Sequence, residues 1–526
     1  INSKVNIEFN DIIKLDTYNE TVLVGSMITM GTLSNYLFKH GYSLTVVPEF
    51  RCLTVGGLIC GAGIESSSFK YGLFPIICKE YNVILGNGEL RTVTEEDSEL
   101  FSAIPLSYGT LCTILSVKLQ IKKIKNFVNL QLIPIKNYNS IKSTFKKILN
   151  EKDKLKYDFI EGISYSKDLC IIILGFISDS PNKVLLKDFW FEPFFYQSII
   201  KNYNKGITNI SMNILDYYFR HDRGAFWMYS SCIHENPLFR FLNPFINSAS
   251  DKLFIPQGIL KLLLKFKDLE IQDSVVPLDK VDKILNFMDK NYDIYPIWFC
   301  PCLNVDATLQ QKKLAYNKIK EYVKLILDGD QQILNMVKQF LEKDIFYRLV
   351  ILVYIFLNFH DDSLKLISLL NLDNNKMDIK NIVKLLTKNK IFIYPDKLEY
   401  IVKEFESYLS NENKTKENTE KFIYKLLESI KIKTSYLGIL HCTVNDEYFI
   451  DVGVYGQSKI NVKNKLNKLE RFTFKNKGFM GQYAVTTFNK NEFEDIVLKK
   501  DWYEFLRKKY NAENRYPTIF DKLGTK

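Results

Sequence analysis

The stretch from Thr54 to Gly72 combines glycines and serines in a way that could hold an anionic ligand. Glycines stand at positions 56, 57, 61 and 63, and serines follow at positions 66 to 68. Glycine has no Cβ, so its backbone can adopt a positive φ and point amide groups at phosphate oxygens. The serine hydroxyls would add further donors. Taken alone, such a stretch indicates a tight turn as readily as a ligand site.

Two short segments carry side chains that could move a proton. In IDVGVYG (450–456), strand alternation places Asp451 and Tyr455 on one face, where the phenol could relay a proton and the carboxylate could orient it. The alternative is that Tyr455 only packs at the end of the strand. Glu161 is an acid inside the apolar strand 159–166 and needs a partner if it is buried. Either a salt bridge or a proton-relay role would meet that need.

Two other segments contain candidates for a binding pocket. Arg220 and Arg223 in RHDR could hold an anionic group such as a phosphate, or they could belong to a structural ion network. Tyr295 and Trp298 in YPIWFCP could line a pocket, or they could be plain core. The five histidines are scattered and the nine cysteines form no C-x-x-C pair. The sequence therefore predicts no metal site and no disulfide framework.

A recognisable series of elements must position these candidates. Residues 22–50 predict a strand, an amphipathic helix, a turn at Gly41 and a second strand. Leu53 to Val55 is predicted as a short strand that ends at the first two glycines. Residues 81–93 then predict a hairpin about Asn87-Gly88, and a second glycine turn at Gly109 leads into another strand. From residue 127 onward, a strand, a helix and two paired strands predict an antiparallel sheet with helices on one face.

Length and composition are those of a globular protein with two or three domains. The chain has 526 residues, of which 46% are hydrophobic and 25% are charged. The net charge of +11 comes from lysines dispersed through the whole chain. No zinc-finger, helix-turn-helix or RNA-recognition pattern accompanies it, so no nucleic-acid partner is predicted.

Residues 306–434 differ in composition and predict a mostly helical insertion. Apolar residues at positions 319, 322, 323 and 326 share one helix face, and the polar run 411–421 predicts a mobile loop. The apolar run 349–357 is shorter than the roughly 20 residues that a membrane-spanning helix needs. It predicts a buried core helix, with a contact on a membrane surface as the alternative.

The order of elements around the glycine-rich stretch resembles the FAD-binding domain of the vanillyl-alcohol-oxidase flavoprotein superfamily. The wording TVGGLI, GIESSS and KYGLF is similar to that of the delta-24 sterol reductase (diminuto-like) family in particular. Further segments of the same family recur in order: FIEGISYS, YYFRHDRGAFW, NPLFRF, IQDSVVP, YPIWFCP, IDVGVYG and NRYPTIFDKL. The matching segments cover most of residues 1–305 and 434–526.

This resemblance implies an α+β fold with a divided domain plan. Residues 1–125 would form a PCMH-type FAD-binding domain, and residues 126–305 the first part of a substrate or cap domain. The helical insertion 306–434 would separate it from the second part of the cap domain, residues 435–526. In the family, a membrane anchor and a first flavin subdomain precede the point where this chain starts. We expect both to be missing from it.

The resemblance also implies which residues bind FAD. They are Thr54, Val55, Gly56, Gly57, Leu58, Ile59, Gly61, Gly63, Ile64, Glu65, Ser66, Ser67, Gly109 and Thr110. Two positions depart from the family pattern. Phe69 stands where related sequences carry histidine, so no histidyl-flavin bond can form there. Cys112 replaces a glycine of the second turn, where a side chain could crowd the flavin or shift the loop.

The activity implied by the resemblance is reduction of a double bond in a sterol side chain. NADPH would pass a hydride to FAD, and reduced FAD would pass it to the alkene, which also needs a proton from a positioned acid. Tyr455 with Asp451 is the first candidate for that acid, and Glu161 is the second. Tyr295 and Trp298 would wall the pocket, and Arg220 and Arg223 would contact flavin or NADPH phosphates. No G-x-G-x-x-G fingerprint locates the NADPH site.

Two other functions remain open at this stage. One is an FAD-dependent oxidase of alcohols or polyols, and the other is a non-catalytic scaffold that retains the fold. For the reductase, the expected partners are a sterol or isoprenoid lipid and, in the full-length protein, a membrane surface. The resemblance places such a protein at the endoplasmic-reticulum membrane, and without an anchor it would be cytoplasmic.

Overall fold

In the computed structural model, the N-terminal and C-terminal parts of the chain belong to the same compact unit. The described residues are 9–94, 98–149, 156–189, 191–228, 269–292, 294–304, 439–440, 448–457, 462–481 and 486–523. One compact unit comprises Ile1–Thr92, Ala103–Asn304 and Tyr436–Lys526, and a second comprises Val93–Ser102 and Val305–Ser435. The predictions for the insertion, including the runs 349–357 and 411–421, lie outside the described residues. Within the described residues, no helix is both long enough and apolar enough to span a membrane.

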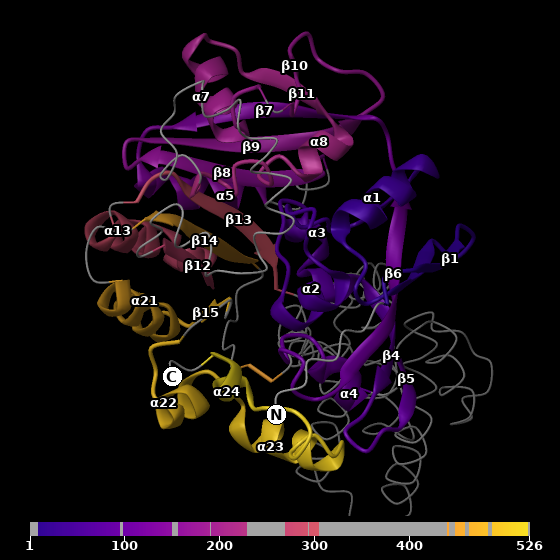
Figure 1. The fold of residues 1–526 in the computed structure, drawn as a ribbon. Coiled ribbons are helices and arrows are strands. Elements are labelled where there is room, and N and C mark those ends of the chain that lie inside the picture. The colour runs from indigo at the N-terminus through magenta and orange to yellow at the C-terminus, as the bar shows by residue number, and fades with distance from the viewer. Residues whose placement is uncertain are drawn as a thin grey trace, which may run out of the picture. The chain divides into compact units, whose positions relative to one another are not determined.

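A six-stranded sheet organises the N-terminal residues of the first unit (Figure 1). Its main path runs β1 (Ile12–Asp16), β2 (Thr21–Gly25), β6 (Thr113–Lys123), β4 (Cys78–Ile84) and β5 (Leu90–Thr94), and β3 (Tyr42–Leu44) pairs with β6. The accompanying helices are α1 (Met30–Lys39), α2 (Val55–Gly61), α3 (Ser68–Tyr71) and the 3-10 turn η1 (Phe74–Ile77). Helix α4 (Ser98–Ala103) belongs to the second unit except for its last residue. The strands, helix and hairpin predicted over 22–50 and 81–93 are therefore confirmed.

The short strand predicted for Leu53 to Val55 is wrong, because α2 begins at Val55. The Thr54 hydroxyl accepts a hydrogen bond from the Gly57 amide, which makes Thr54 the N-cap of the helix. The Cα of Gly56 lies so close to Ser26 that an added Cβ would stand 3.1 Å from the Ser26 carbonyl oxygen. This glycine is explained by the packing of the helix against the sheet.

The second sheet has nine strands and is almost wholly antiparallel. Its order is β10 (Leu185–Leu186), β11 (Asn209–Asn213), β7 (Phe127–Ile135), β9 (Leu169–Ser178), β8 (Phe159–Ser166), β13 (Ile297–Leu303), β14 (Tyr448–Gln457), β12 (Leu269–Pro277) and β15 (Phe479–Met480). Only β10 and β11 pair in parallel among the pairs described. β14 lies between β13 and β12, although the whole insertion separates it from them in sequence (Figure 1). Leu303 and Tyr448 are paired across β13 and β14, so residues far apart in the sequence lie side by side in this sheet.

Three amphipathic helices cover one face of this sheet, which we call the helix face. They are α5 (Ile141–Ile148), α13 (Val281–Asn291) and α21 (Val462–Lys475). Phe145, Leu285 and Leu469 of these helices join one apolar cluster with Phe299 and Val452 of the strands. Burial of such side chains from water is the main force that holds helices on a sheet. The helix and strands predicted over residues 127–178 are confirmed.

Connecting elements complete the first unit. They are η2 (Tyr138–Ser140), α7 (Phe195–Asn204), α8 (Ile214–Tyr218), η3 (Leu278–Lys280), α22 (Lys490–Ile496), α23 (Lys500–Lys509) and α24 (Ile519–Leu523). The last helices bind residues of the second glycine turn: Tyr503 Oη donates to Thr110 Oγ1 at 2.9 Å, and Arg507 Nη1 donates to the Thr110 carbonyl at 2.7 Å. These contacts connect the last helices, which the sequence assigns to the second part of the cap domain, to the second glycine turn. Arg507 is buried and finds its carbonyl acceptors in the glycine turn and in its own C-terminal segment.

Candidate active site

The face of the nine-stranded sheet opposite the helices carries acids and aromatic residues, and we call it the site face. Strand pairing sets Cys300 opposite Asp451, and Trp298 opposite Gly453. Gly453 is also opposite Asp273, on the other neighbouring strand. Because side chains alternate along a strand, the buried residues in the next sentence all lie on the site face. They are Glu161, Asp273, Trp298, Cys300, Asp451 and Tyr455.

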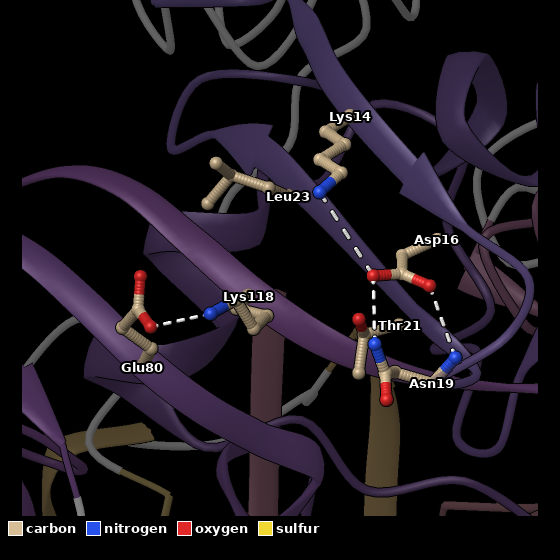
Figure 2. A pocket seen from close by; sticks show the side chains of 7 residues that line it. All are labelled: Lys14, Asp16, Asn19, Thr21, Leu23, Glu80 and Lys118. Carbon is tan, nitrogen blue, oxygen red and sulfur yellow. Dashed lines mark hydrogen bonds and ion pairs between the residues drawn. The ribbon is translucent and has the colours of Figure 1, made fainter.

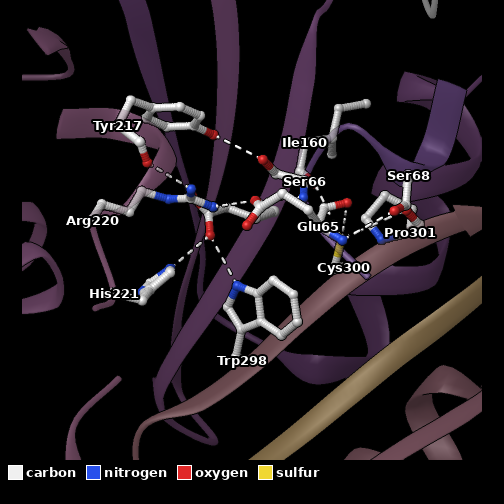
Figure 3. Close-up of polar contacts among 11 residues, drawn as sticks. Glu65, Ser66, Ser68, Ile160, Tyr217, Arg220, His221, Trp298, Cys300 and Pro301 are labelled. Carbon is white, nitrogen blue, oxygen red and sulfur yellow. Dashed lines mark hydrogen bonds and ion pairs between the residues drawn. The ribbon is translucent and has the colours of Figure 1, made fainter. Parts of the chain in front are cut away.

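A buried ion pair network ties this face to the segment after the glycines (Figure 3). Arg220 Nε donates to Glu161 Oε1 at 2.7 Å, and Arg220 Nη2 donates to Glu65 Oε1, also at 2.7 Å. His221 Nε2 lies 3.1 Å from Glu161 Oε2, and Trp298 Nε1 donates to that oxygen at 2.9 Å. Burial alone would raise the pKa of Glu161, but the charges of Arg220 and His221 hold it well below its usual range. Glu161 is therefore an ionised member of a salt bridge.

The two arginines are occupied within the protein. The three guanidinium nitrogens of Arg220 donate hydrogen bonds to Glu65, Glu161 and the Tyr217 carbonyl. Arg223 Nε donates to Asp188 at 2.9 Å, and its other nitrogens donate to the carbonyls of residues 192 and 193. Of the two interpretations of RHDR, the geometry agrees with the structural ion network.

Tyr455 is oriented by Asp273 and not by Asp451, which corrects the prediction. The Tyr455 phenol donates to Asp273 Oδ1 in a short hydrogen bond. It reaches that carboxylate by lying across Gly453, where an added Cβ would stand 2.3 Å from the phenol oxygen and 2.7 Å from Asp273 Oδ1. The glycine is thus what allows this contact. Both carboxylate oxygens of Asp451 are buried and have no hydrogen-bond partner among the described residues.

Asp451 belongs to a group of three acids that we call the acid cluster, together with Glu49 and Asp273. Burial raises the pKa of Asp451 well above its usual range, and the nearby charges of Asp273 and Glu49 raise it further. Burial likewise raises the pKa of Glu49, with Glu65 and Asp273 adding to the effect. Glu49 is half-buried, but its Oε2 atom is inaccessible and has no hydrogen-bond partner. Such surroundings favour the neutral form of a carboxyl group over its charged form.

An aromatic stack supports the Tyr455 ring. Phe226 stacks on Tyr455 with ring centres 4.2 Å apart, and its other side stacks on His221 at 4.4 Å. Phe226 has a φ of 58° and Ala225 a φ of 42°, in the left-handed region that side chains other than glycine rarely adopt. The chain therefore accepts backbone strain at the point where it inserts this ring beside Tyr455.

The two residues predicted to line the pocket, Tyr295 and Trp298, lie on opposite faces of the nine-stranded sheet. Trp298 lies on the site face beside Glu161, whereas Tyr295 packs against the apolar cluster of the helix face. The Tyr295 phenol donates to Asp289 of α13 at 2.7 Å and lies 2.8 Å from the Tyr138 hydroxyl. Tyr295 therefore does not share a wall with Trp298.

The predicted FAD-binding residues divide into buried and open groups. Val55, Leu58, Ile59, Ile64 and Ser67 are buried, and Gly63 packs against Pro48, which an added Cβ would approach to 2.8 Å. Ser66 Oγ lies 3.1 Å from the Tyr217 hydroxyl, within the ion network. Gly57 is exposed, and no atom lies within 4 Å of the position a Cβ would take at Gly61.

The open glycines lie near the second glycine turn. The Tyr108 amide donates to the Cys60 carbonyl at 3.1 Å, which joins the end of α2 to that turn. Lys522 of α24 donates to the Tyr108 carbonyl, and its ammonium forms no ion pair among the described residues. Burial raises the pKa of the neighbouring Cys112 thiol, so the side chain that replaces the expected glycine is uncharged and enclosed.

Sequence reasoning missed Glu49, Asp273 and Lys522. Asp273 carries the same signal as Glu161, because it is an acid inside an apolar strand, IQDSVVP. That signal could have found it. Glu49 lies in an irregular segment and Lys522 lies in the short last helix, and neither segment has a hydrophobic periodicity that would point to these residues.

A hollow elsewhere in the first unit has a different character (Figure 2). It measures about 490 Å³ and is lined by residues of the six-stranded sheet, among them Lys14, Asp16, Glu80 and Lys118. Its charges pair with one another, Lys14 with Asp16 and Lys118 with Glu80. Nothing in it repeats the unpaired acids of the site face.

Comparisons with known proteins agree with the resemblance found in the sequence. Residues 4–94 match the family model described as "FAD binding domain". A Delta(24)-sterol reductase homolog of Caenorhabditis elegans is 34% identical over 313 residues, which are 55% of this chain and 59% of that protein. The Delta(24)-sterol reductase of Rattus norvegicus is 34% identical over 304 residues, or 56% of this chain and 58% of that protein. That of Arabidopsis thaliana is 31% identical over 310 residues, or 56% and 55%. The chain thus spans less than two thirds of the length of these relatives.

Proposed function

We propose that this chain, which resembles the Delta(24)-sterol reductases, acts as an FAD-dependent reductase of a carbon–carbon double bond. The substrate would be the side chain of a sterol or isoprenoid lipid, and NADPH would be the source of the hydride. The observation that carries the proposal is the buried carboxyl group of Asp451 on the site face, which has no hydrogen-bond partner among the described residues and whose pKa is raised by its burial. An isolated alkene accepts hydride poorly, so its reduction needs such an acid in a dry pocket.

The residues present are suited to FAD. Gly57, Gly61 and Gly109 would bring open backbone close to the cofactor, and Lys522 would place a positive charge near its pyrophosphate. The Oε2 atoms of Glu65 and Glu49 are buried without partners, and the N–H and O–H groups of a flavin and its ribityl chain are donors of the required kind. When bound, FAD would accept a hydride from the nicotinamide and pass it to the alkene.

The protein's own contribution would be the proton. Tyr455 donates to Asp273, which gives that carboxyl group a hydrogen-bond partner. The charge of Asp273 in turn helps to keep the proton on Asp451. In this proposal Asp451 is the proton donor, Asp273 and Tyr455 position and polarise it, and Trp298 and Phe226 exclude water.

The test is an anaerobic absorbance titration of the full-length protein. We expect NADPH to bleach the flavin spectrum, and a side-chain-unsaturated sterol to restore it. A flavin that is bleached by an alcohol or polyol and not by NADPH would instead establish the oxidase. A protein that holds no flavin at all would favour the scaffold.

A further inference from the structure

We propose that Tyr503 and Arg507 of α23 are positioning residues for FAD, which act by holding the second glycine turn (residues 107–110) in the shape that receives the cofactor. This inference rests on the proposed function, because the turn is assigned to FAD only through the family resemblance. It adds residues that lie 393 and 397 positions away from the turn in the sequence.

The turn has a backbone that favours glycine at more positions than it has glycines. The Thr110 amide donates to the Ser107 carbonyl at 3.1 Å, which closes the turn. Its two central residues, Tyr108 and Gly109, have φ angles of 54° and 64°, and Leu106 just before it has a φ of 60°. Tyrosine and leucine rarely adopt this left-handed region. Such a backbone persists only where the surrounding structure holds it in place.

Two side chains of α23 hold this turn. Tyr503 and Arg507 stand one helical turn apart, so they share a face of the helix, and both are buried. Tyr503 Oη donates to Thr110 Oγ1 at 2.9 Å, and Arg507 Nη1 donates to the Thr110 carbonyl at 2.7 Å. Arg507 also donates to the carbonyls of residues 512, 513, 516 and 517. These bonds fix the guanidinium group that holds the Thr110 carbonyl.

The hydrogen bonds of the Tyr503 phenol form a chain that runs in one direction. The Ile519 amide donates to Tyr503 Oη at 3.2 Å, the phenol donates to Thr110 Oγ1, and the Thr110 hydroxyl donates to the Ser107 carbonyl at 2.7 Å. Each group in such a chain polarises the next, which strengthens the bonds. The Thr110 hydroxyl is engaged on both sides within the protein, so its effect on the cofactor is exerted through the shape of the turn.

The turn is joined in its other direction to the glycine-rich helix α2. The Tyr108 amide donates to the Cys60 carbonyl at 3.1 Å, and the Leu106 amide donates to the Ile59 carbonyl at 3.1 Å. Lys522 donates to the Tyr108 carbonyl. A turn released from α23 would therefore shift the open backbone at its own glycine, the end of α2 and the Lys522 ammonium together.

The experiment measures FAD affinity and stability separately, on the full-length protein from which the flavin has been removed. Tyr503→Phe removes the hydroxyl group that binds the turn and keeps the ring. Tyr516→Phe is the matched control, because the Tyr516 hydroxyl lies 3.0 Å from Thr113 Oγ1 and donates to the Ile84 carbonyl at 3.2 Å, outside the turn. The quantities to measure are the dissociation constant for FAD, from quenching of flavin fluorescence, and the free energy of unfolding in urea without FAD.

We expect Tyr503→Phe to raise the dissociation constant for FAD by about three- to tenfold, the range that one hydrogen bond is worth. Tyr516→Phe should lose a similar amount of stability and keep the FAD affinity of the wild type. If Tyr503→Phe loses stability but binds FAD as tightly as the wild type, Tyr503 is a structural residue and the inference is overturned. Equal losses of FAD affinity in the two variants would also overturn it.

Thr110→Val removes the same hydrogen bond from the side of the turn. In its background Tyr503→Phe should cause little further loss of FAD affinity, because the two groups share one bond. A full further loss contradicts the inference. If Tyr503→Phe does not fold, Thr110→Val decides the matter, and wild-type affinity in that variant overturns the inference.

The failure of this inference can be told apart from the failure of the proposed function. A wild-type protein that binds no FAD removes both. A wild type that binds FAD, with an unaffected Tyr503→Phe variant, removes only the inference.

Discussion

The two faces of the nine-stranded sheet are built from alternate residues of the same strands, yet one carries an apolar core and the other carries buried acids. On the helix face, Val452 and Phe299 are buried among other apolar side chains, and each contact lowers the free energy of the fold. On the site face, the neighbouring residues Asp451 and Cys300 are equally buried, but Asp451 has no hydrogen-bond partner among the residues that the structure describes. A carboxyl group left in this state weakens the fold. The comparison teaches that stability comes from one face, and that the other keeps groups suited to chemistry.

The largest effect expected from this comparison is a loss of activity at Asp451. Asp451→Asn removes the acid while keeping the shape, and we expect the rate of flavin recovery with sterol to fall by about 10² to 10⁴. Its free energy of unfolding in urea should be unchanged or higher, because a strained acid is lost.

Val452→Ala, one residue along on the helix face, is the matched control. It should lower the free energy of unfolding by about 2 kcal/mol and leave the recovery rate intact at low temperature. If instead Asp451→Asn unfolds more easily than Val452→Ala, the division of labour between the faces is wrong.

The next effect concerns the ion network that borders the site face. Arg220→Met leaves Glu65 and Glu161 as buried charges without their cation, and we expect a loss of about 3–5 kcal/mol in urea unfolding. Arg471→Met serves as the comparison, since Arg471 pairs with Glu492 on the surface and should cost at most about 1 kcal/mol. Similar losses for the two variants would show that the buried network does not depend on its charges.

A smaller effect is expected from filling the gap at Gly453. Gly453→Ala places a methyl group against the Tyr455 phenol and Asp273, so the tyrosine must move away. We expect a loss of about 1–3 kcal/mol from overpacking, together with a reduced recovery rate. Tyr455→Phe in the same background should then cause little additional loss of rate. A full additional loss would mean that the phenol acts without its contact to Asp273.

The smallest effect, counted per pH unit, is a slope in the pH dependence of stability. The pKa of Asp451 is raised in the fold, so above about pH 4 the unfolded chain loses this proton first. Stability should therefore fall as the pH rises from about 4 toward the folded-state pKa.

Asp451→Asn should remove up to about 1.4 kcal/mol per pH unit of that decline, measured by urea unfolding between pH 4.5 and 8. Glu161 has the opposite sign, because its pKa is lowered in the fold. Its contribution is present above its unfolded pKa and is lost only at more acidic pH, outside this range. Parallel curves for the variant and the wild type would show that Asp451 is not protonated in the fold.

Much of the fold could be predicted from the sequence, because alternation and helical spacing are local signals. The strands at 127–135 and 169–178 and the helix at 141–148 are of this kind. The strand predicted at Leu53 to Val55 is wrong, because a helix N-cap and the end of a strand give the same local sequence pattern when glycines follow. Asp451 and Tyr455 were rightly placed on one face, but their partners depend on strand register. Asp273 lies far away in sequence, and only the pairing of β12 with β14 brings it to Tyr455.

The position of β14 between β13 and β12 has a consequence for how the chain is made. When the ribosome has completed β12 and β13, about 140 residues must still be synthesised before β14 emerges. At cellular rates of translation this takes on the order of ten seconds. During that interval both strands present open edges that another chain could pair with. Until β14 is synthesised, β12 and β13 are therefore prone to pair with other chains, and β14 both brings Asp451 to the site face and ends that exposure.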